Sequence, residues 1–474
     1  MVRRTRACQA CRSRRMRCDE TLPQCDQCLR AGRQCPGPIS GAIIVDVTTQ
    51  TVIRARSKLI NSFHRPQTQN PPAQLISPSQ SPIIIQNFLS RFLDYFASRS
   101  SSSPGRFWLH ELPSLSTSGT RNGLELAVQA TSTAFCASAT SNLSYYAGSR
   151  KIYGEALQKH SRSIAALRNS GSQVRAIAAA QLLCTTLLLC FYEAISSTQS
   201  GGEGYMRHVE GAAKMVEVLG PEGCADGLVN ELFFTARRQM LLISFLTRKP
   251  SIYATPEYLS IPSQGGIKPV HERLMDILTL LIEELNFPSD NRLEHPTRGP
   301  IFLTNVEKDL QGLWIEFQTC YYPGSLSEPG TEEATATSTS TSTSTDSSVD
   351  YPNSFTAYIE SYFLFSRILC RVIGNRDVSP FLDIQEDEVI HHASASILSC
   401  AAYLETQNLG CGFISAVLPL HAVGIYGSVE DRKAARVVLE TWRDRGVVRG
   451  LVGLVLVRLD SECGENSSLW AEPN

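Results

Sequence analysis

Six cysteines near the N-terminus are the residues whose type and spacing point most directly to chemistry. They are Cys8, Cys11, Cys18, Cys25, Cys28 and Cys35, and the pattern Cys-x2-Cys-x6-Cys occurs twice with an offset of 17 residues. A closed structural zinc site needs four ligands in a tetrahedron, so two sites would need eight ligands from six residues. Six cysteines can fill the eight ligand positions if two of the sulfurs each bind both metals. No His lies within the cluster to serve as a further ligand. The spacing therefore predicts two Zn²⁺ ions held by six thiolates.

Other metal sites built from cysteine fit this spacing less well. A zinc ribbon or RING-type site would show two separate groups of four ligands, and the doubled spacing does not match the cysteine run of a ferredoxin. About 30 polar residues cannot bury enough apolar surface to fold alone, and below about 40 residues metals or disulfides usually supply the missing stability. Metal binding is then folding free energy, so we expect the metal-free segment to be unfolded.

The same segment is strongly basic. Residues 1–38 contain nine Arg, no Lys and three acidic residues, a formal charge of +6, whereas the remaining 436 residues sum to −7. A basic head on a mildly acidic body favours an anionic partner for the head alone. Four of the arginines, Arg12, Arg14, Arg15 and Arg17, lie between the second and third cysteines. The alternative is a solvated basic turn that only keeps the cluster soluble, and the number of arginines favours nucleic acid instead.

The stretch from the first to the last of these cysteines, CQACRSRRMRCDETLPQCDQCLRAGRQC, resembles the fungal binuclear zinc-cluster (Zn2Cys6) domain of transcription factors at every spacing. In that family the first and fourth cysteines bridge the two metals, and these positions are Cys8 and Cys25 here. The resemblance implies a small fold of two short helices around two Zn²⁺ ions. It implies one zinc bound by Cys8, Cys11, Cys18 and Cys25, and a second bound by Cys25, Cys28, Cys35 and Cys8.

The resemblance also implies roles for the arginines. In the family, the two basic residues three and four places after the second cysteine read a short GC-rich triplet in the major groove, and here they are Arg14 and Arg15. Arg can pair bidentately with guanine O6 and N7. The family more often carries Lys at one or both positions, and the two side chains are not interchangeable, so the preferred triplet stays open. The remaining arginines expected at DNA bind phosphates, which position the protein without reading sequence: Arg3, Arg4, Arg6, Arg12 and Arg17.

These implications favour a nuclear, zinc-dependent, sequence-specific DNA-binding regulator of transcription by RNA polymerase II. Its expected partners are double-stranded DNA and transcriptional coactivators or corepressors, with no membrane, and the Arg-rich segment also suits a nuclear import patch. Family members often bind two triplets as a homodimer, but no run of three apolar heptads follows Cys35, so a homodimer and a monomer both stay open. The alternative function is a helical scaffold or ligand sensor whose zinc head mediates protein contacts with little specific DNA binding.

The rest of the chain divides by composition into a linker and a body. We expect the zinc-cluster domain at residues 1–40, a linker with a short ordered segment at 41–82, and the body at 83–465. Within the linker, the β-branched residues 42–47 suit a short strand, and the Pro-, Gln- and Ser-rich residues 67–82 suit a flexible tether. Residues 323–353 contain a Ser/Thr repeat with almost no large apolar residues, and we expect a disordered insert there.

The body is predicted to be a large all-α regulatory domain. From about Ile83, apolar residues recur at three- and four-residue steps, strand signals are few and no βαβ alternation appears. The most apolar stretch, residues 176–192, is shorter than the about 20 residues that span a bilayer, which favours a buried helix. After a first helix near Ile83, the expected helices are 124–140, 154–168, 174–195, 205–219, 228–246, 270–285, 305–320, 356–373, 386–406, 413–426, 428–445 and 451–459.

Three short motifs in the body resemble the fungal-specific transcription factor domain, more narrowly its second type. They are YGEAL from Tyr153, LLLCFYE ending at Glu193, and HVEGAA from His208. The resemblance covers most of residues 83–460 and implies a helical regulatory domain that modulates the head and contacts coactivators or effectors. We expect His208 to be a packed histidine with a backbone or Glu partner, and Gly211 and Ala212 to permit close helix packing.

Nothing in the sequence predicts an enzyme. There is no Gly-x-Ser-x-Gly elbow, no Gly-x-Gly-x-x-Gly after a strand, no P-loop and no His-Glu-x-x-His. The nine cysteines outside the cluster are scattered singly, mostly in apolar segments, and should behave as small buried hydrophobes. No apolar run follows the first arginines, so no secretory signal peptide and no disulfide framework are expected. Acidic residues at 386–388 suit a helix start, with a small acidic activation patch as the alternative.

Overall fold

The computed structural model describes the head as separate residues and the body as longer segments. In the head these are Cys8, Ala10, Cys11, Arg14, Met16, Cys18, Asp19, Thr21, residues 24–33 and Cys35. In the body they are residues 82–97, 108–116, 122–167, 172–196, 202–263, 266–286, 300–322, 351–378, 387–446 and 448–465. The chain forms two compact units, residues 1–75 and 76–474. The predicted strand at 42–47, the tether up to residue 81 and the insert up to residue 350 lie outside the described residues.

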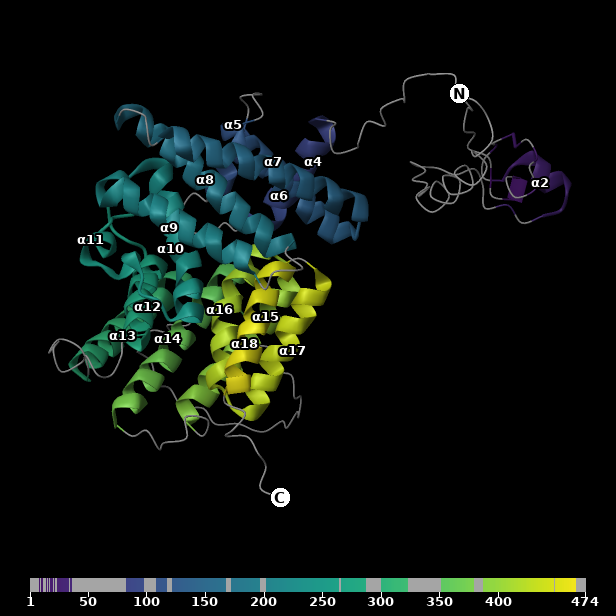
Figure 1. Cartoon of the computed structure of the whole chain (residues 1–474). Coiled ribbons are helices and arrows are strands. Elements are labelled where there is room, and N and C mark those ends of the chain that lie inside the picture. The colour runs from purple at the N-terminus through teal and green to yellow at the C-terminus, as the bar shows by residue number, and fades with distance from the viewer. Residues whose placement is uncertain are drawn as a thin grey trace, which may run out of the picture. The chain divides into compact units, whose positions relative to one another are not determined.

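The second unit is an array of helices, as predicted, and its described segments contain no strand (Figure 1). The long helices are α4 (Pro82–Phe96), α6 (Gly123–Thr140), α7 (Leu143–Leu167), α8 (Ser172–Ser196), α9 (Glu203–Gly223), α10 (Gly227–Thr247), α12 (Val270–Asn286), α13 (Pro300–Tyr321), α14 (Ser354–Val378), α15 (Glu388–Gln407), α16 (Gly410–Tyr426), α17 (Val429–Arg445) and α18 (Arg449–Glu465). Short helical turns are η2 (Trp108–Glu111), α5 (Leu112–Leu115), η3 (Ile252–Ala254) and α11 (Pro256–Leu259). The first unit contains α2 (Asp26–Arg30).

Side chains cap several of these helices and fix where they begin. The Asn122 side chain accepts a hydrogen bond from Glu125 N at 2.9 Å, and Ser428 Oγ accepts one from Asp431 N at 3.2 Å. Asp387 Oδ1 accepts from the first backbone amides of α15, the nearer at 2.9 Å. Such caps satisfy donors that have no partner within the first turn. Asp387 therefore caps the start of α15, which agrees with the interpretation of residues 386–388 as a helix start.

One continuous apolar core runs through the body, from Phe88 in α4 to Leu459 in α18. Helix α6 packs against α4, α7 and α8, while α16 packs against α14, α15, α17 and α18. Helix α18 returns to pack on α8, so helices from the two ends of the body share this core. Ala178–Ser196 is long and apolar enough to cross a membrane, but 78% of it is buried inside the protein, as expected for a core helix.

Helix α7 differs most from its predicted bounds, because it begins at Leu143 rather than near residue 154. Asn142 sets this start, since its Oδ1 accepts hydrogen bonds from Ser144 N at 2.9 Å and Tyr145 N at 3.3 Å. Gly154, where the prediction placed the start, lies inside the helix. The turns η2, α5, η3 and α11 were not predicted, because three or four residues are too few to show a helical period.

Candidate metal centre

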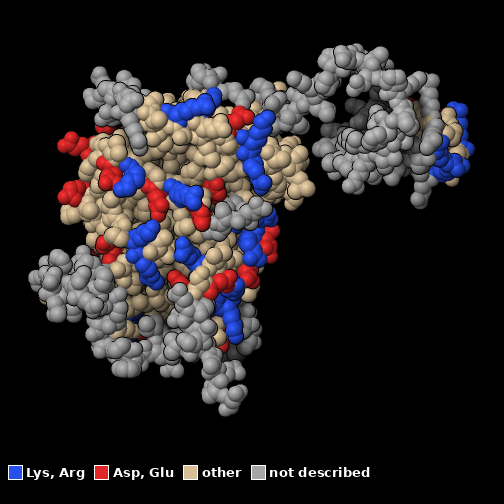
Figure 2. All heavy atoms as spheres, in the orientation of Figure 1, with Lys and Arg blue, Asp and Glu red and all other residues tan. Residues whose placement is uncertain are grey.

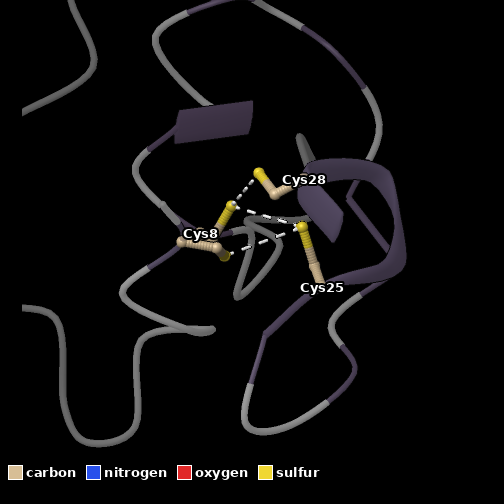
Figure 3. Close-up of side chains that lie close together, drawn as sticks. Cys8, Cys25 and Cys28 are labelled. Atoms are coloured by element: carbon tan, nitrogen blue, oxygen red, sulfur yellow. Dashed lines mark hydrogen bonds between the residues drawn. The ribbon is translucent and has the colours of Figure 1, made fainter. Parts of the chain in front are cut away.

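The cysteines of the head converge on one another. Their sulfurs form two groups of four, and within each group all ligand atoms lie within 4.8 Å of one another. One group is Cys8, Cys11, Cys18 and Cys25, and the other is Cys8, Cys25, Cys28 and Cys35. Cys8 and Cys25 belong to both groups, and they face each other in Figure 3. The two groups have the same members as the two ligand sets that the resemblance implies.

The sulfur–sulfur distances have the size that tetrahedral zinc requires. A Zn–S bond of about 2.3 Å places two ligands of a tetrahedron about 3.8 Å apart. Cys25 Sγ lies 3.6 Å from Cys8 Sγ, 3.7 Å from Cys11 Sγ and 3.8 Å from Cys35 Sγ. A disulfide needs about 2.05 Å, and these cysteines are free. The residues present therefore fit two zinc ions, which supply folding free energy and hold the thiolates.

Without metal, burial disfavours the thiolate form of these cysteines. Burial raises the pKa of Cys11 to about 12, and it raises the pKa of Cys25 further. Zinc ligands must be thiolates, so bound cations have to offset this shift. Two backbone amides also donate to sulfur, Cys11 N to Cys8 Sγ and Cys8 N to Cys18 Sγ, both at 3.4 Å. Such donors orient the ligands and stabilise their charged form.

The sequence repeat of the head is also a repeat in structure. Met16 N donates to Cys11 O at 3.0 Å, and 17 residues later Arg33 N donates to Cys28 O at 3.0 Å. In the second half the chain turns at Gly32, whose φ of 64° lies in the left-handed region that favours glycine. Each Cys-x2-Cys pair therefore begins a helical turn that ends in the same hydrogen bond.

The two halves differ in the side chains that their turns carry. Arg14 lies in the turn after Cys11 and is exposed to solvent. The 17-residue offset places Ala31 at the equivalent position of the second half, so only the first half carries a cation there. The other arginines assigned to DNA lie outside the described residues: Arg3, Arg4, Arg6, Arg12, Arg15 and Arg17.

Thr21, which the sequence analysis did not single out, orders the loop between the halves. Its Oγ1 accepts a hydrogen bond from Asp26 N at 3.1 Å and donates to Gln24 O at 3.2 Å. It thereby satisfies the first amide of α2. A threonine five residues before a helix has no standard capping spacing, so the sequence alone offered no signal for it.

The three motifs of the body meet at one hydroxyl. Tyr153 Oη, on α7, lies 2.6 Å from Glu193 Oε1 on α8 and 2.8 Å from His208 Nε2 on α9. Burial lowers the pKa of His208 to about 4 and raises the pKa of Glu193. The imidazole is therefore neutral at neutral pH. Its side-chain partner is Tyr153, which links it to the glutamate.

The close approach of α9 to α8 occurs at a different glycine from the one expected. A Cβ added at Gly211 would meet only Thr186 Cγ2, at 4.0 Å, which is ordinary contact. A Cβ added at Gly204 would lie 2.5 Å from the carboxyl carbon of Glu193. Gly211 therefore has room for a Cβ, and the contact on α9 that requires a glycine is at Gly204, one helical turn before His208.

Comparison with known families finds one match in the head and one in the first part of the body. A model described as Fungal Zn(2)-Cys(6) binuclear cluster domain matches residues 6–40, and one described as Fungal specific transcription factor domain, of the second type, matches residues 73–250. No curated protein and no solved structure matches the chain. These are domains of transcription factors rather than of enzymes, and the cluster domain binds DNA. The chain therefore carries a fungal Zn(2)-Cys(6) binuclear cluster followed by a fungal specific transcription factor domain, the two domains of a DNA-binding regulator of transcription.

Proposed function

We propose that the chain is a zinc-dependent, sequence-specific regulator of RNA polymerase II transcription whose head reads GC-rich triplets in the major groove. The observation that carries this proposal is the pair of sulfur groups sharing Cys8 and Cys25, with the exposed turn at Arg14 directly after Cys11. In the proposal Cys8 and Cys25 bridge two zinc ions, and the other four cysteines complete the two tetrahedra. The protein acts in the nucleus.

The arginines of the head divide into two roles. Arg14 and Arg15 read guanine edges, and the lack of a cation at Ala31 and Gly32 supports reading by the first half alone. Arg3, Arg4, Arg6, Arg12 and Arg17 bind phosphates and fix the head on the duplex. On the face of the body shown in Figure 2, basic and acidic side chains are interspersed, and neither sign forms a continuous field. This supports the head as the DNA-binding part.

The helical body, residues 83–465, regulates the head and contacts coactivators or corepressors. Its continuous apolar core supports a folded domain on which such contacts can form. The proposal covers a monomer on one triplet and a homodimer on two triplets, the homodimer with contacts supplied by the body. The competing function, a scaffold or ligand sensor with a protein-binding head, gains no support from the arginine-rich turn after Cys11.

Binding-site selection from random duplexes tests this function. The zinc-loaded full chain is compared with the same protein treated with a chelator. We expect one or two GC-rich triplets to be enriched, and chelation to abolish the enrichment. The number and spacing of the triplets then distinguish a monomer from a homodimer. Zinc binding without any enriched sequence would favour the scaffold function instead.

A further inference from the structure

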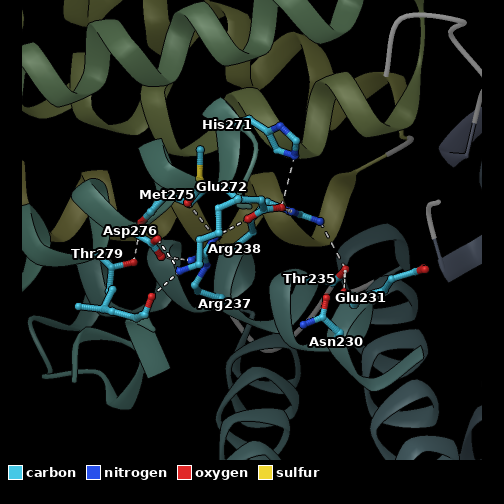
Figure 4. Close-up of polar contacts among 12 residues, drawn as sticks. Asn230, Glu231, Thr235, Arg237, Arg238, His271, Glu272, Met275, Asp276 and Thr279 are labelled. Carbon is cyan, nitrogen blue, oxygen red and sulfur yellow. Dashed lines mark hydrogen bonds and ion pairs between the residues drawn. The ribbon is translucent and has the colours of Figure 1, made fainter. Parts of the chain in front are cut away.

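A group of charged side chains is buried between α10 and α12 (Figure 4). Arg237 is 1% exposed, and its two terminal nitrogens bind the carboxylates of Glu272 and Asp276. Arg238 Nη1 lies 2.6 Å from Glu272 Oε1, and Lys268 Nζ lies 2.6 Å from Asp276 Oδ2. Burial alone would raise the pKa of Glu272, but Arg238 and Arg237 lower it well below its usual range. Glu272 is therefore ionised at neutral pH.

Two donors beside this cluster lack a partner among the described residues. They are Arg237 Nε and Tyr253 Oη, and both residues are 1% exposed. Both residues line one cavity, between α10, η3 and α12. A buried donor without a hydrogen bond is strongly destabilising, and such groups in folded proteins usually bond to water. The cavity has room for about one water molecule and is too small for an organic effector.

We propose that this cavity binds one ordered water molecule, which accepts hydrogen bonds from Arg237 Nε and Tyr253 Oη. Two residues on the cavity wall can accept the protons of the water. Thr279 Oγ1 donates its own proton to Met275 O at 2.7 Å and keeps its lone pairs. The Glu283 carboxylate also lines the cavity and has lone pairs to spare. A water with two donors and two acceptors around it has the coordination usual for buried solvent.

The charges around the cavity select water rather than a small anion. Two donors alone would also suit a halide. However, the Glu283 carboxylate lines the same cavity, and Glu272 and Asp276 already bind the terminal nitrogens of Arg237. Burial raises the pKa of Tyr253, so its hydroxyl keeps its proton and acts as a donor at neutral pH. A neutral ligand that both accepts and donates is complementary to this wall.

The water site joins segments on either side of residue 250, where the family match ends. Helix α10, with Arg237, lies inside the matched residues 73–250, whereas Tyr253 and Thr279 follow them. Through the water, η3 and α12 are bonded to the guanidinium of α10. In this chain the regulatory domain therefore extends structurally to at least α12. The inference does not depend on which DNA sequence the head reads.

The substitution Tyr253→Phe tests the site, because it removes one donor and keeps the ring. If the hydroxyl is bonded to water, its loss lowers the melting temperature of the helical body in the full chain by about 1–3 °C. If the hydroxyl has no partner, the Phe variant melts at the same or a higher temperature, and the proposal is overturned. Tyr426→Phe is the control, because its hydroxyl accepts an exposed hydrogen bond from Arg248 Nη2, at 3.3 Å, and does not line the cavity.

A crystal structure of the full chain gives an independent readout. We expect a single peak of water density within hydrogen-bond distance of Arg237 Nε and Tyr253 Oη, and no anomalous signal there after soaking in bromide. An empty cavity would overturn the proposal, and so would a bromide ion in it.

Discussion

At the scale of single residues, Arg14 separates base reading from charge attraction. The substitution Arg14→Ala should cost about 1–3 kcal/mol on the selected duplex and relax the preference at one base pair. The reason is that a bidentate contact to guanine is lost together with one charge. Equilibrium titration of the selected duplex and of a random duplex, at one salt concentration, measures the effect. An equal loss on both duplexes would contradict the base-reading role.

Arg17 tests a phosphate contact in the same way that Arg14 tests base reading. The substitution Arg17→Ala should weaken binding to every duplex by a similar factor. It should also reduce the slope of log K against log salt by about 1, because one fewer counterion is released. Titrations at three salt concentrations give the slope. An unchanged slope would exclude the phosphate contact.

Two buried histidines, His160 and His421, and the half-buried His208 make the body sensitive to acid. Burial lowers the pKa of His160 and His208 to about 4, and that of His421 to about 3. In the unfolded chain each titrates near 6.5, so as the pH falls below that value the unfolded state binds protons first. Stability is therefore lost from about pH 6.5 down to the folded pKa. The expected loss is about 2 kcal/mol for each histidine between pH 7.5 and 5.

His421 offers the sharpest test of this acid sensitivity. It is fully buried in α16, and neither ring nitrogen has a partner in the described part of the chain. Replacing it with Leu should leave stability at pH 7.5 equal or higher, because an unsatisfied polar group is removed. It should also reduce the loss on going to pH 5 by about 2 kcal/mol. Urea denaturation followed by the helical circular dichroism signal measures both, and an unchanged loss would refute the assignment.

At the scale of helices, α7, α8 and α9 are joined by two polar layers. In the second layer His160 Nε2 lies 2.9 Å from Thr186 Oγ1, which also contacts the sulfur of Met215 at 3.4 Å. Each helix contributes residues seven apart to the two layers, which are Tyr153, Glu193 and His208 in one and His160, Thr186 and Met215 in the other. Sliding one helix past the others would leave buried polar groups unpaired, so the layers fix the register of the three helices.

Two glycines on α9 form a matched pair of substitutions. Gly204→Ala should destabilise the body by about 1 kcal/mol, because its Cβ would overlap the Glu193 carboxylate, and moving that side chain would break its hydrogen bond with Tyr153 Oη. Gly211→Ala should be neutral or stabilise by up to about 1 kcal/mol, because Ala favours the helix and the site has room. Thermal melting of both variants measures the two changes in stability. Equal effects would show that α9 does not approach α8 at Gly204.

The sequence predicted those features that depend on local spacing. The six cysteines identified the metal centre because ligand type, number and spacing are all written in the chain. Most helix positions followed from apolar periodicity, whereas the start of α7 depended on a cap by Asn142 that periodicity does not show. No local spacing of this kind predicts the contacts between helices. Tyr153 meets residues 40 and 55 positions away, and Arg237 meets Asp276 39 positions away, so only folding brings them together.

At the scale of the whole molecule, the regulatory body should not fold when it is cut at residue 250, where the family match ends. The cut removes Glu272 and Asp276, which are the ion-pair partners of Arg237. It also removes α18 and exposes the apolar surface of α8. We expect the cut chain to aggregate and to lack a cooperative melt, whereas a chain ending at residue 465 melts like the full protein. A cooperative melt of the shorter chain would contradict the single shared core.

The two compact units differ in what stabilises each fold. Removal of zinc should therefore unfold the head and leave the body folded. The head has a core made of cysteines, so without metal its thiols reprotonate and its fold is lost. The body has a continuous apolar core, and its described residues contain no group of His, Cys, Asp or Glu side chains placed to bind a metal ion. A chelator should therefore abolish duplex binding while the helical signal and the melting temperature of the body stay unchanged. Adding back two equivalents of Zn²⁺ should restore binding. A shift of the body's melting temperature on chelation would show instead that the folded head stabilises the body.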